Sequence, residues 1–533
     1  MRIKAVLLFC LLTFSLQAKD YYPVQNSIDV IHYEFTVYLS DTYNKIRGEA
    51  KLEISHTGRT REIILDLVNL DEEGRGMIVE KVTLDNESVE WDHSDDRLHL
   101  YLPGEKKAGE SSILYIKYHG VPADGMVISM NRHGRRTFFA DNWPDRARNW
   151  IPCIDHPSDK AQVDFIVYAP QKYRVVSNGY LHEESTLPGG MKLTHWKEEI
   201  NIPTKVMVIG VAEFATRLAG RIDGTDIWTC VFPEDREAGF SDYSLATGPF
   251  EWYSDMIGPY PYEKLANVQS KTMFGGMENA GCIFYSESSV TGRGRAEGLI
   301  AHEIAHQWFG NSVSEKDWHH IWLSEGFATY LTALYQGHRE GEEKLEETME
   351  RARHRVIRSY WNNPVPVIDT TIANYMRLLN ANSYQKGSWV LHMLHNELGD
   401  DLFWAGIRAY YARYRDSNAL TSDFVNTMED VSGRDLDGFF HQWLYIPGHP
   451  RLNISWSYDR GSKEITLLLE QVQQGHVFEF PLDIQIDDPS GSRVETIMVT
   501  SKIQSFVLES ANAPPGLKID PGVNLLFEEV EGK

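Results

Sequence analysis

The stretch that decides the fold runs from residue 297 to residue 330 and reads EGLIAHEIAHQWFGNSVSEKDWHHIWLSEGFATY. Its centre is an HEIAH pentad that contains His302, Glu303 and His306. Residues four apart lie on the same face of a helix, so His302 and His306 can offer two imidazole nitrogens to one metal ion. Glu303 then stands beside that metal, where it is placed to act as a base.

A third protein ligand is needed, because a catalytic zinc ion usually takes three protein groups and keeps one position for water. The candidate is Glu325, which follows His306 by nineteen positions in a segment that predicts a second helix. Gly310 and Asn311 favour the end of the first helix between them. We therefore predict an antiparallel helix pair on which His302, His306 and Glu325 hold one Zn²⁺ ion.

Several motifs stand together in the order and spacing of one enzyme family. The zinc motif is preceded by a Gly-x-Met-Glu-Asn segment made up of Gly275, Gly276, Met277, Glu278 and Asn279. Further shared segments are PCIDHP at 152–157, YQKG at 384–387 and QWL at 442–444, so the likeness covers most of the chain. The sequence resembles the zinc aminopeptidases of the aminopeptidase N and leukotriene hydrolase family.

The resemblance implies an α+β multidomain protein of the short, three-domain bacterial type. Its parts would be an N-terminal antiparallel β domain, a thermolysin-like and mainly α-helical zinc catalytic domain, and a C-terminal β-sandwich. The family's larger members carry a further helical domain, and this chain stops before it, so we expect a more open cleft. The likeness of YQKG to a family motif also implies that Tyr384 donates to the oxyanion that forms during hydrolysis.

The segment 275–279 explains why such an enzyme would trim from the end of a peptide. The carboxylate of Glu278, held one residue's length from the zinc, can pair with a free α-ammonium group, so the first peptide bond falls at the metal. The backbone of Gly275 and Gly276 has no side chain in the way and can pair with an extended substrate as an added strand. Met277 and Asn279 complete the predicted substrate-binding segment.

One position departs from the family pattern. In the family, a Gln or Glu shortly before the 152–157 segment helps to hold the amino group of the substrate, and the matching position here is Trp143. Either Asp141 or Asn142 supplies the polar contact from a shifted loop, or Trp143 packs the wall of the pocket.

Hydrophobic patterning divides the chain into β, helical and β parts. Apolar and polar residues alternate over many short runs up to about residue 233, which puts one face of each strand on a core. The pattern then changes to that of helices, and strands return after Pro447 and Gly448. We place a signal peptide at 1–18, the N-terminal β domain at 19–233, the catalytic domain at 234–448 and the C-terminal β-sandwich at 449–533.

Charge and the N-terminus narrow the class of protein further. The chain has 52 Lys and Arg against 76 Asp and Glu, a net charge of −24, which argues against nucleic acid as a partner. Arg2 and Lys4 precede a short apolar run and Ala18, the pattern of a signal peptide, so we expect export to the periplasm or out of the cell. That run is too short to span a bilayer, and no stable membrane insertion is expected. The charges between Glu342 and Arg358 are typical of a solvated helix face.

The function that these features predict is hydrolysis of the N-terminal bond of peptides with a free N-terminus, with Glu303 as general base. A zinc endopeptidase on the same scaffold is disfavoured, because a buried Glu278 penalises an uncharged peptide segment. Epoxide hydrolysis, which one branch of the family adds, is required by no residue of this chain. A catalytically inactive peptide-binding protein would have lost Glu303, a zinc ligand or Tyr384, and all of them are present. The sequence selects neither a preferred N-terminal residue nor an oligomeric state.

Overall fold

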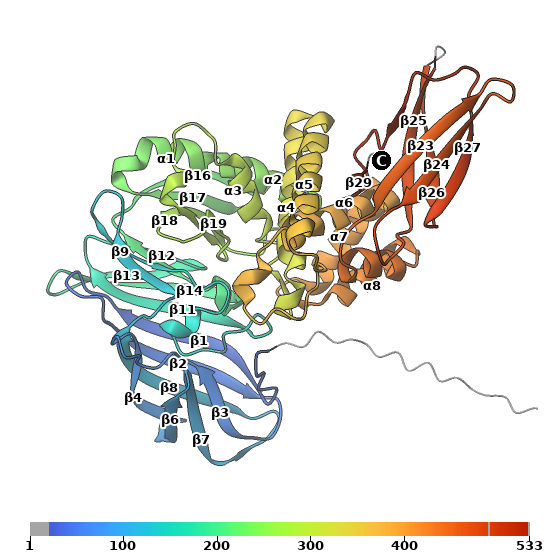
Figure 1. The fold of residues 1–533 in the computed structure, drawn as a ribbon. Coiled ribbons are helices and arrows are strands. Elements are labelled where there is room, and N and C mark those ends of the chain that lie inside the picture. The colour runs from blue at the N-terminus through green and yellow to red at the C-terminus, as the bar shows by residue number, and fades with distance from the viewer. Residues whose placement is uncertain (1–20, 489–490, 531–533) are drawn as a thin grey trace, which may run out of the picture.

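The computed structural model describes residues 21–488 and 491–530, so the signal peptide predicted at 1–18 lies outside the described residues. The described chain follows the predicted order of β, helical and β parts (Figure 1). Every helix among the described residues is too short or too polar to cross a bilayer. The three cysteines that follow the predicted signal peptide are buried and carry free thiols.

The N-terminal domain is built on one large sheet. Its strand order is β13 (Tyr180–Leu187), β14 (Met191–Pro203), β11 (Lys160–Pro170), β1 (Ile28–Tyr38), β2 (Ile46–His56), β8 (Ser111–Val121), β4 (Gly76–Leu84), β5 (Glu87–Ser88). The central strand β1 runs antiparallel to β2 and parallel to β11. Tyr33, Phe35 and Val37 alternate with partly exposed residues and are fully buried, which confirms the predicted strand pattern.

Two smaller sheets complete this domain. One has the order β3 (Thr60–Asp66), β7 (Arg97–Lys106), β6 (Glu90–Ser94). The other has the order β12 (Arg174–Ser177), β15 (Ile209–Ala212), β10 (Arg136–Ala140), β9 (Met126–Met130). The apolar faces of all three sheets contribute to one hydrophobic cluster.

The catalytic region begins with a five-stranded sheet that starts earlier than the sequence predicted. Its order is β16 (Ala215–Ile222), β17 (Thr225–Val231), β18 (Lys264–Ser270), β20 (Cys282–Ser286), β19 (Gly276–Met277). The predicted boundary at 233 assigned β16 and β17 to the N-terminal domain, but β17 pairs in parallel with β18. Alternation identifies a strand without naming its partner, so the sequence pattern placed this boundary too late.

Helices lie before, within and after the stretch 297–330. They are α1 (Arg236–Tyr243), α2 (Thr247–Ile257), α3 (Glu297–Ala305), α4 (Trp322–Glu340), α5 (Glu342–Asn362), α6 (Gly387–Leu398), α7 (Asp400–Tyr414), α8 (Thr421–Ser432) and α9 (Asp437–Phe440). A two-stranded sheet of β21 (Val313–Glu315) and β22 (Ser417–Ala419) ties the segment after α3 to the segment after α7.

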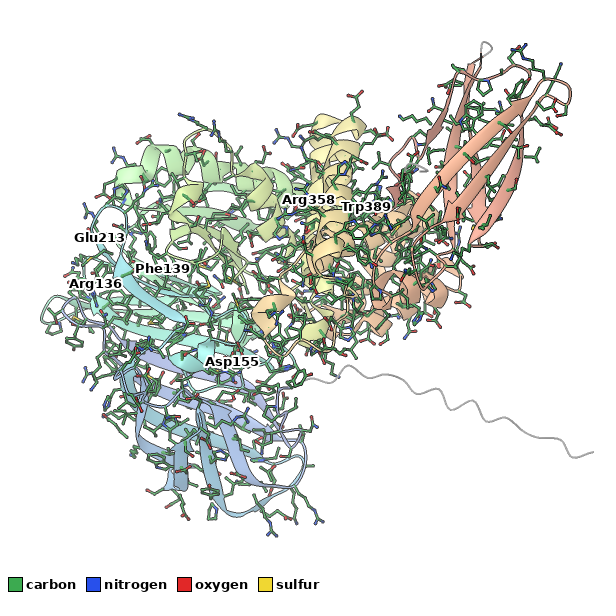
Figure 2. The ribbon with its side chains drawn as sticks, in the orientation of Figure 1. Arg136, Phe139, Asp155, Glu213, Arg358 and Trp389 are labelled. Atoms are coloured by element: carbon green, nitrogen blue, oxygen red, sulfur yellow. The ribbon has the colours of Figure 1, made fainter. Side chains whose placement is uncertain are left out.

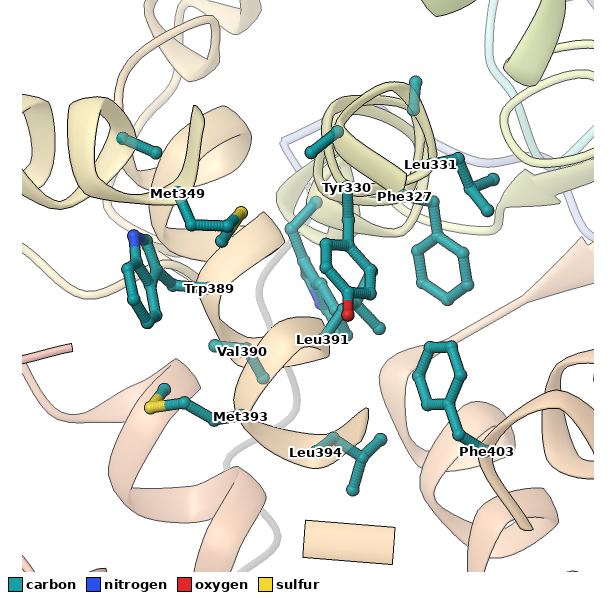
Figure 3. Packing of buried hydrophobic residues seen from close by; sticks show 14 of the residues in the cluster. Phe327, Tyr330, Leu331, Met349, Trp389, Val390, Leu391, Met393, Leu394 and Phe403 are labelled. Atoms are coloured by element: carbon teal, nitrogen blue, oxygen red, sulfur yellow. The ribbon is translucent and has the colours of Figure 1, made fainter. Parts of the chain in front are cut away.

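Helix α4 is the centre of the helical core. It packs against α3, α5 and α6, and Figure 3 shows Phe327, Tyr330 and Leu331 of α4 among the apolar side chains of α6 and α7. A Cβ on Gly326 would lie 3.0 Å from Gly387 Cα, so glycine at this position lets α4 and α6 approach closely. Burial of each large apolar side chain contributes roughly 1.5–3 kcal/mol, which makes α4 a rigid platform for Glu325.

The C-terminal part is a two-sheet β domain. One sheet has the order β27 (Ile503–Glu509), β24 (Glu464–Gln471), β23 (Arg451–Asp459), β29 (Glu528–Glu529), and the other β26 (Gly491–Val499), β25 (Phe480–Asp488), β28 (Leu517–Ile519). Leu467 of β24 and Ile484 of β25 are fully buried and belong to the same hydrophobic cluster as the catalytic helices. The β-sandwich therefore shares a core with the catalytic region.

Candidate metal centre

Two helices bring three ligand groups to one point. Helix α3 carries His302 and ends at Ala305, so that His306 caps it, and α4 carries Glu325 in its first turn. The Nε2 atoms of His302 and His306 are 3.2 Å apart, and Glu325 Oε2 lies 3.4 Å from the first and 3.3 Å from the second. The predicted ligand triad thus converges on a single site.

The helix that carries the histidines ends earlier than the sequence predicted. Gly310 and Asn311 were expected to end it, but α3 stops at Ala305 and single hydrogen-bonded turns continue to Gly310. Gly310 has a φ of +122°, and a Cβ there would lie 3.0 Å from His306 Nδ1. Glycine at this position therefore leaves room for the imidazole of His306.

Neighbouring groups orient the imidazole of His306. Its Nδ1 lies 3.2 Å from the carbonyl oxygen of Phe309 and 3.0 Å from Ser324 Oγ. A proton on Nδ1 that is donated to the carbonyl leaves the lone pair on Nε2, which faces His302 and Glu325. This is the tautomer that a metal ligand needs.

The ligand set fits a zinc ion. Zinc ligands at about 2.0–2.1 Å in a tetrahedron lie about 3.4 Å from one another, close to the separations within the triad. Glu325 Oε2 is buried and faces the Nε2 atoms of both histidines. The three atoms therefore form a ready-made coordination site for a small divalent cation.

Burial sets the protonation of the groups around the site. It lowers the pKa of His302, which favours the neutral imidazole that metals bind. Burial, together with the charges of Glu278 and Glu325, raises the pKa of Glu303 well above its usual value, although His306 opposes the shift. Burial and the same glutamates also raise the pKa of Tyr384, so its hydroxyl stays protonated and can donate a hydrogen bond.

The triad opens into a cavity of about 240 Å³ that holds most of the predicted site residues. The residues that line it are Trp143, Phe274, Gly275, Gly276, Met277, Glu278, Leu299, His302, Glu303, His306, Glu325, Leu379 and Tyr384. Tyr384 lies in the helical turn Asn382–Lys386 before α6, with its ring stacked on that of His302 at 6.0 Å between centroids. Asn279 is buried outside this lining.

Two side chains that the sequence interpretation missed hold Glu278 in place. Gln307 Nε2 and Asn311 Nδ2 donate to the backbone carbonyl of Glu278 at 2.7 and 2.6 Å, and Gln307 Oε1 accepts from Gly281 N at 2.8 Å. Gln307 follows the pentad directly and Asn311 stands five positions after His306, and the polarity of both beside Trp308 and Phe309 was the available signal. They tie the loop after α3 to the backbone that carries Glu278, directly after β19.

The loop that contains Asn311 is anchored from the N-terminal domain. The buried ammonium group of Lys160, on β11, donates to the carbonyl oxygens of Asn311, Ser312 and Ser417 at 2.9, 2.8 and 3.0 Å. Burial lowers the pKa of Lys160 to about 7. The N-terminal domain therefore supports the site through backbone contacts.

The position that departs from the family pattern packs the pocket wall. Trp143 lines the cavity and makes edge-to-face contacts with Phe274 and Trp318. The amide of Asn142 donates to the carbonyl oxygens of Thr204 and Met207 and accepts from Trp150 Nε1, so it has no group left for a substrate.

Asp141, the other polar candidate, is not among the residues that line the cavity. Its carboxylate pairs with Arg146 and accepts a hydrogen bond from Met273 N. Of the alternatives that the sequence left open, the structure selects packing by Trp143.

Gly276 leaves room for the carboxylate of Glu303. A Cβ at position 276 would lie within 2.7 Å of Glu303 Cγ and closer still to its carboxylate. We expect Gly276→Ala to displace Glu303 and lower kcat by about 10- to 100-fold, with metal content unchanged, because misplacement by about 1 Å has effects of this size. Steady-state kinetics and metal analysis check this.

The control is Gly438→Ala, an exposed position of α9 outside the cavity where a Cβ would meet nothing within 4 Å. It should keep most of the activity. Equal losses in the two variants would show that the clearance at Glu303 is not the reason for Gly276.

A buried His, His and Glu triad with a glutamate beside it is the arrangement that HExxH metallopeptidases use. Comparison with known proteins is more specific. The model of the peptidase M1 N-terminal domain matches residues 30–206, and that of the peptidase family M1 domain matches residues 243–443. The chain belongs to peptidase family M1.

The chain is also similar to curated aminopeptidases. It is 27% identical to "Probable aminopeptidase 2" of Sulfurisphaera tokodaii over 83% of this chain and 57% of that protein. It is 24% identical to a leucyl aminopeptidase of Saccharolobus solfataricus over 90% of this chain and 61% of that protein. The human glutamyl aminopeptidase is 27% identical over 72% of this chain and 42% of its own length. The chain therefore spans about half the length of the curated relatives it matches.

Proposed function

We propose that this protein is a zinc-dependent aminopeptidase that releases N-terminal residues from peptides. The observation that carries the proposal is the carboxylate of Glu278, which lines the cavity of the ligand triad. Glu278 is 5% exposed, and its Oε1 has no hydrogen-bond partner among the described residues. A buried carboxylate oxygen of this kind needs a cation, and the α-ammonium group of a peptide supplies one.

Residues of the cavity supply the metal ligands, the general base and the hydrogen-bond donor to the oxyanion. A zinc ion on His302, His306 and Glu325, when bound, supplies a water of lowered pKa and polarises the scissile carbonyl. The carboxylate of Glu303 accepts the proton of the attacking water and passes it to the leaving amine. The hydroxyl of Tyr384 donates to the oxyanion.

The strand β19 and its flanks hold the substrate. The short backbone segment from Gly275 to Met277 reaches the cavity, where an extended peptide can pair with it. Glu278 fixes the amino end, so a peptide presents its first bond to the triad. An internal segment of a longer chain has no ammonium group to offer, which makes cleavage inside a chain unfavourable.

The experiment that tests this proposal compares one peptide with a free N-terminus and the same peptide N-acetylated, with and without a zinc chelator. We expect the free peptide to be shortened one residue at a time and the chelator to stop it. The acetylated peptide should be cut at least about 30-fold more slowly, because a buried charge pair left without its partner costs about 2–5 kcal/mol. Mass spectrometry of the products reads the result.

The variant Glu278→Gln sharpens the comparison. It should lower kcat/KM for the free peptide and shrink the difference between the two peptides, since the amide pairs less strongly with an ammonium group. Cleavage of the acetylated peptide at the wild-type rate would replace this proposal with an endopeptidase. Zinc binding without cleavage of either peptide would point to a peptide-binding protein.

A further inference from the structure

A second cavity adjoins the catalytic one on the side of Tyr384. It has a volume of about 630 Å³ and shares Leu379 and Tyr384 with the catalytic cavity. None of its lining residues belongs to the segment 275–279 that presents Glu278. A peptide whose amino end is fixed at Glu278 and whose first bond lies at the triad therefore has this second cavity available for its leaving part.

One wall of the second cavity is a face of helix α5. Arg355, Arg358, Ser359 and Asn362 line it at positions i, i+3, i+4 and i+7, which lie on one side of a helix. The opposite face of α5 is buried through Met349, Ala352, Arg353 and Val356. Figure 2 shows Arg358 on this helix. The solvated helix face that the sequence predicted thus forms part of a concave surface.

The positive charge of this wall is not neutralised by acidic side chains among the described residues. Arg355 and Arg358 form no ion pair among the described residues, and the lining of the cavity contains no acidic residue. Neighbouring arginines on α5 are paired: Arg351 with Glu347, and Arg353 with Glu350 and Asp520. In a chain with a net charge of −24, two adjacent unpaired guanidinium groups in one cavity are a local exception.

We propose that this second cavity binds a carboxylate on the leaving part of the substrate. A guanidinium group presents planar N–H donors that match a carboxylate in a two-point hydrogen bond. The inference rests on the proposed function for the direction of the peptide. With Glu278 at the amino end and the arginine pair at the other, the preferred substrates are short peptides whose terminal carboxylate reaches α5.

The first test compares di-, tri- and tetrapeptides as free acids and as C-terminal amides. We expect one length to be cleaved with about tenfold higher kcat/KM as the free acid, mainly through a lower KM. Amides of the same series with Asp or Asn at the terminal position separate the two sources of a carboxylate. If Asp restores the preference in an amide, an acidic side chain is also accepted; if only the free acid is preferred, the terminal carboxylate is the ligand.

The double variant Arg355→Gln/Arg358→Gln tests the residues. It should abolish the preference for acid over amide, whereas the control Arg351→Gln, which removes one charge from the same helix outside the cavity, should keep it. An unchanged preference in the double variant, or no preference at any length in the wild type, would overturn the inference. Thermal unfolding of each variant verifies that it is folded.

A substrate without a carboxylate tests the proposed aminopeptidase activity separately from carboxylate binding in the second cavity. An aminoacyl coumarin amide carries no carboxylate and reports aminopeptidase activity alone. If the wild type fails to cleave it, the proposed function fails. Calorimetric binding of the free-acid and amide peptides to Glu303→Gln protein then still measures the preference for a carboxylate, and equal affinities would refute the second cavity as its site.

Discussion

Replacing Glu303 with glutamine is expected to lower kcat by about 10³-fold and to leave the metal content of the protein unchanged. General acid and base catalysis by a positioned side chain contributes about 10²–10⁴-fold, and an amide of the same shape cannot accept the proton of the attacking water. Glu303 is not a member of the ligand triad, so metal content should stay at the wild-type level. Turnover of a peptide substrate and metal analysis of the same sample give the two numbers.

The control for this experiment is Glu297→Gln on the same helix. Glu297 begins α3 and contacts Arg339 and Tyr335, away from the catalytic cavity. It should retain most of the activity. A Glu303→Gln protein that keeps more than a tenth of wild-type kcat would rule out Glu303 as the base.

Replacing Glu325 with glutamine is expected to weaken zinc binding by more than about 100-fold and to reduce turnover to background. Loss of an outer partner of a ligand already weakens metal affinity by about 10–100-fold, and Glu325 would contact the metal directly. The neutral amide also removes the charge that raises the pKa of His306 to about 9 against the effect of burial, which favours the neutral imidazole. Weaker binding of zinc would therefore come from the lost carboxylate ligand and not from protonation of His306. Dialysis against buffers of known free zinc concentration, followed by metal analysis of the protein, measures the affinity for zinc.

Thermal unfolding gives an independent measure of the same site. A ligand that binds only the native state stabilises it by RT ln(1 + [L]/Kd), so added zinc should raise the Tm of the metal-free wild type. The rise should be far smaller for Glu325→Gln and unchanged for Glu340→Gln, an exposed control at the end of α4. Equal stabilisation of all three proteins would show that zinc binds elsewhere.

Local patterns account for the parts of the site that were predictable. The spacing of His302 and His306 follows from the pitch of a helix, and the strands around Tyr33 and Phe35 follow from alternation. The placement of Tyr384 came from a motif, because nothing in its own surroundings along the chain distinguishes it from other tyrosines. The structure puts it beside His302.

The remaining features depend on contacts between distant segments. The parallel pairing of β17 with β18 moved the domain boundary, and no property of either strand alone specifies that partner. The hydrogen bonds from Gln307 and Asn311 to Glu278 join the loop after α3 to the residue that follows β19, about thirty positions earlier in the chain. The role of Trp143 depended on whether Asp141 and Asn142 were already engaged, which only the folded chain shows.

The buried lysine of β11 affects how freely the N-terminal domain could be exchanged between related proteins. Lys160 donates to three backbone oxygens of the catalytic region, and carbonyl oxygens have no side-chain identity. The recipient loop can therefore diverge in sequence without losing the contact, whereas a transplanted N-terminal domain must bring a lysine at this depth. Without it, the loop would lose three hydrogen bonds, while Asn311 O and Ser312 O would keep Ser314 Oγ and Ser417 N as donors. An exchanged N-terminal domain should therefore hold this loop less firmly unless it carries a lysine at the same place.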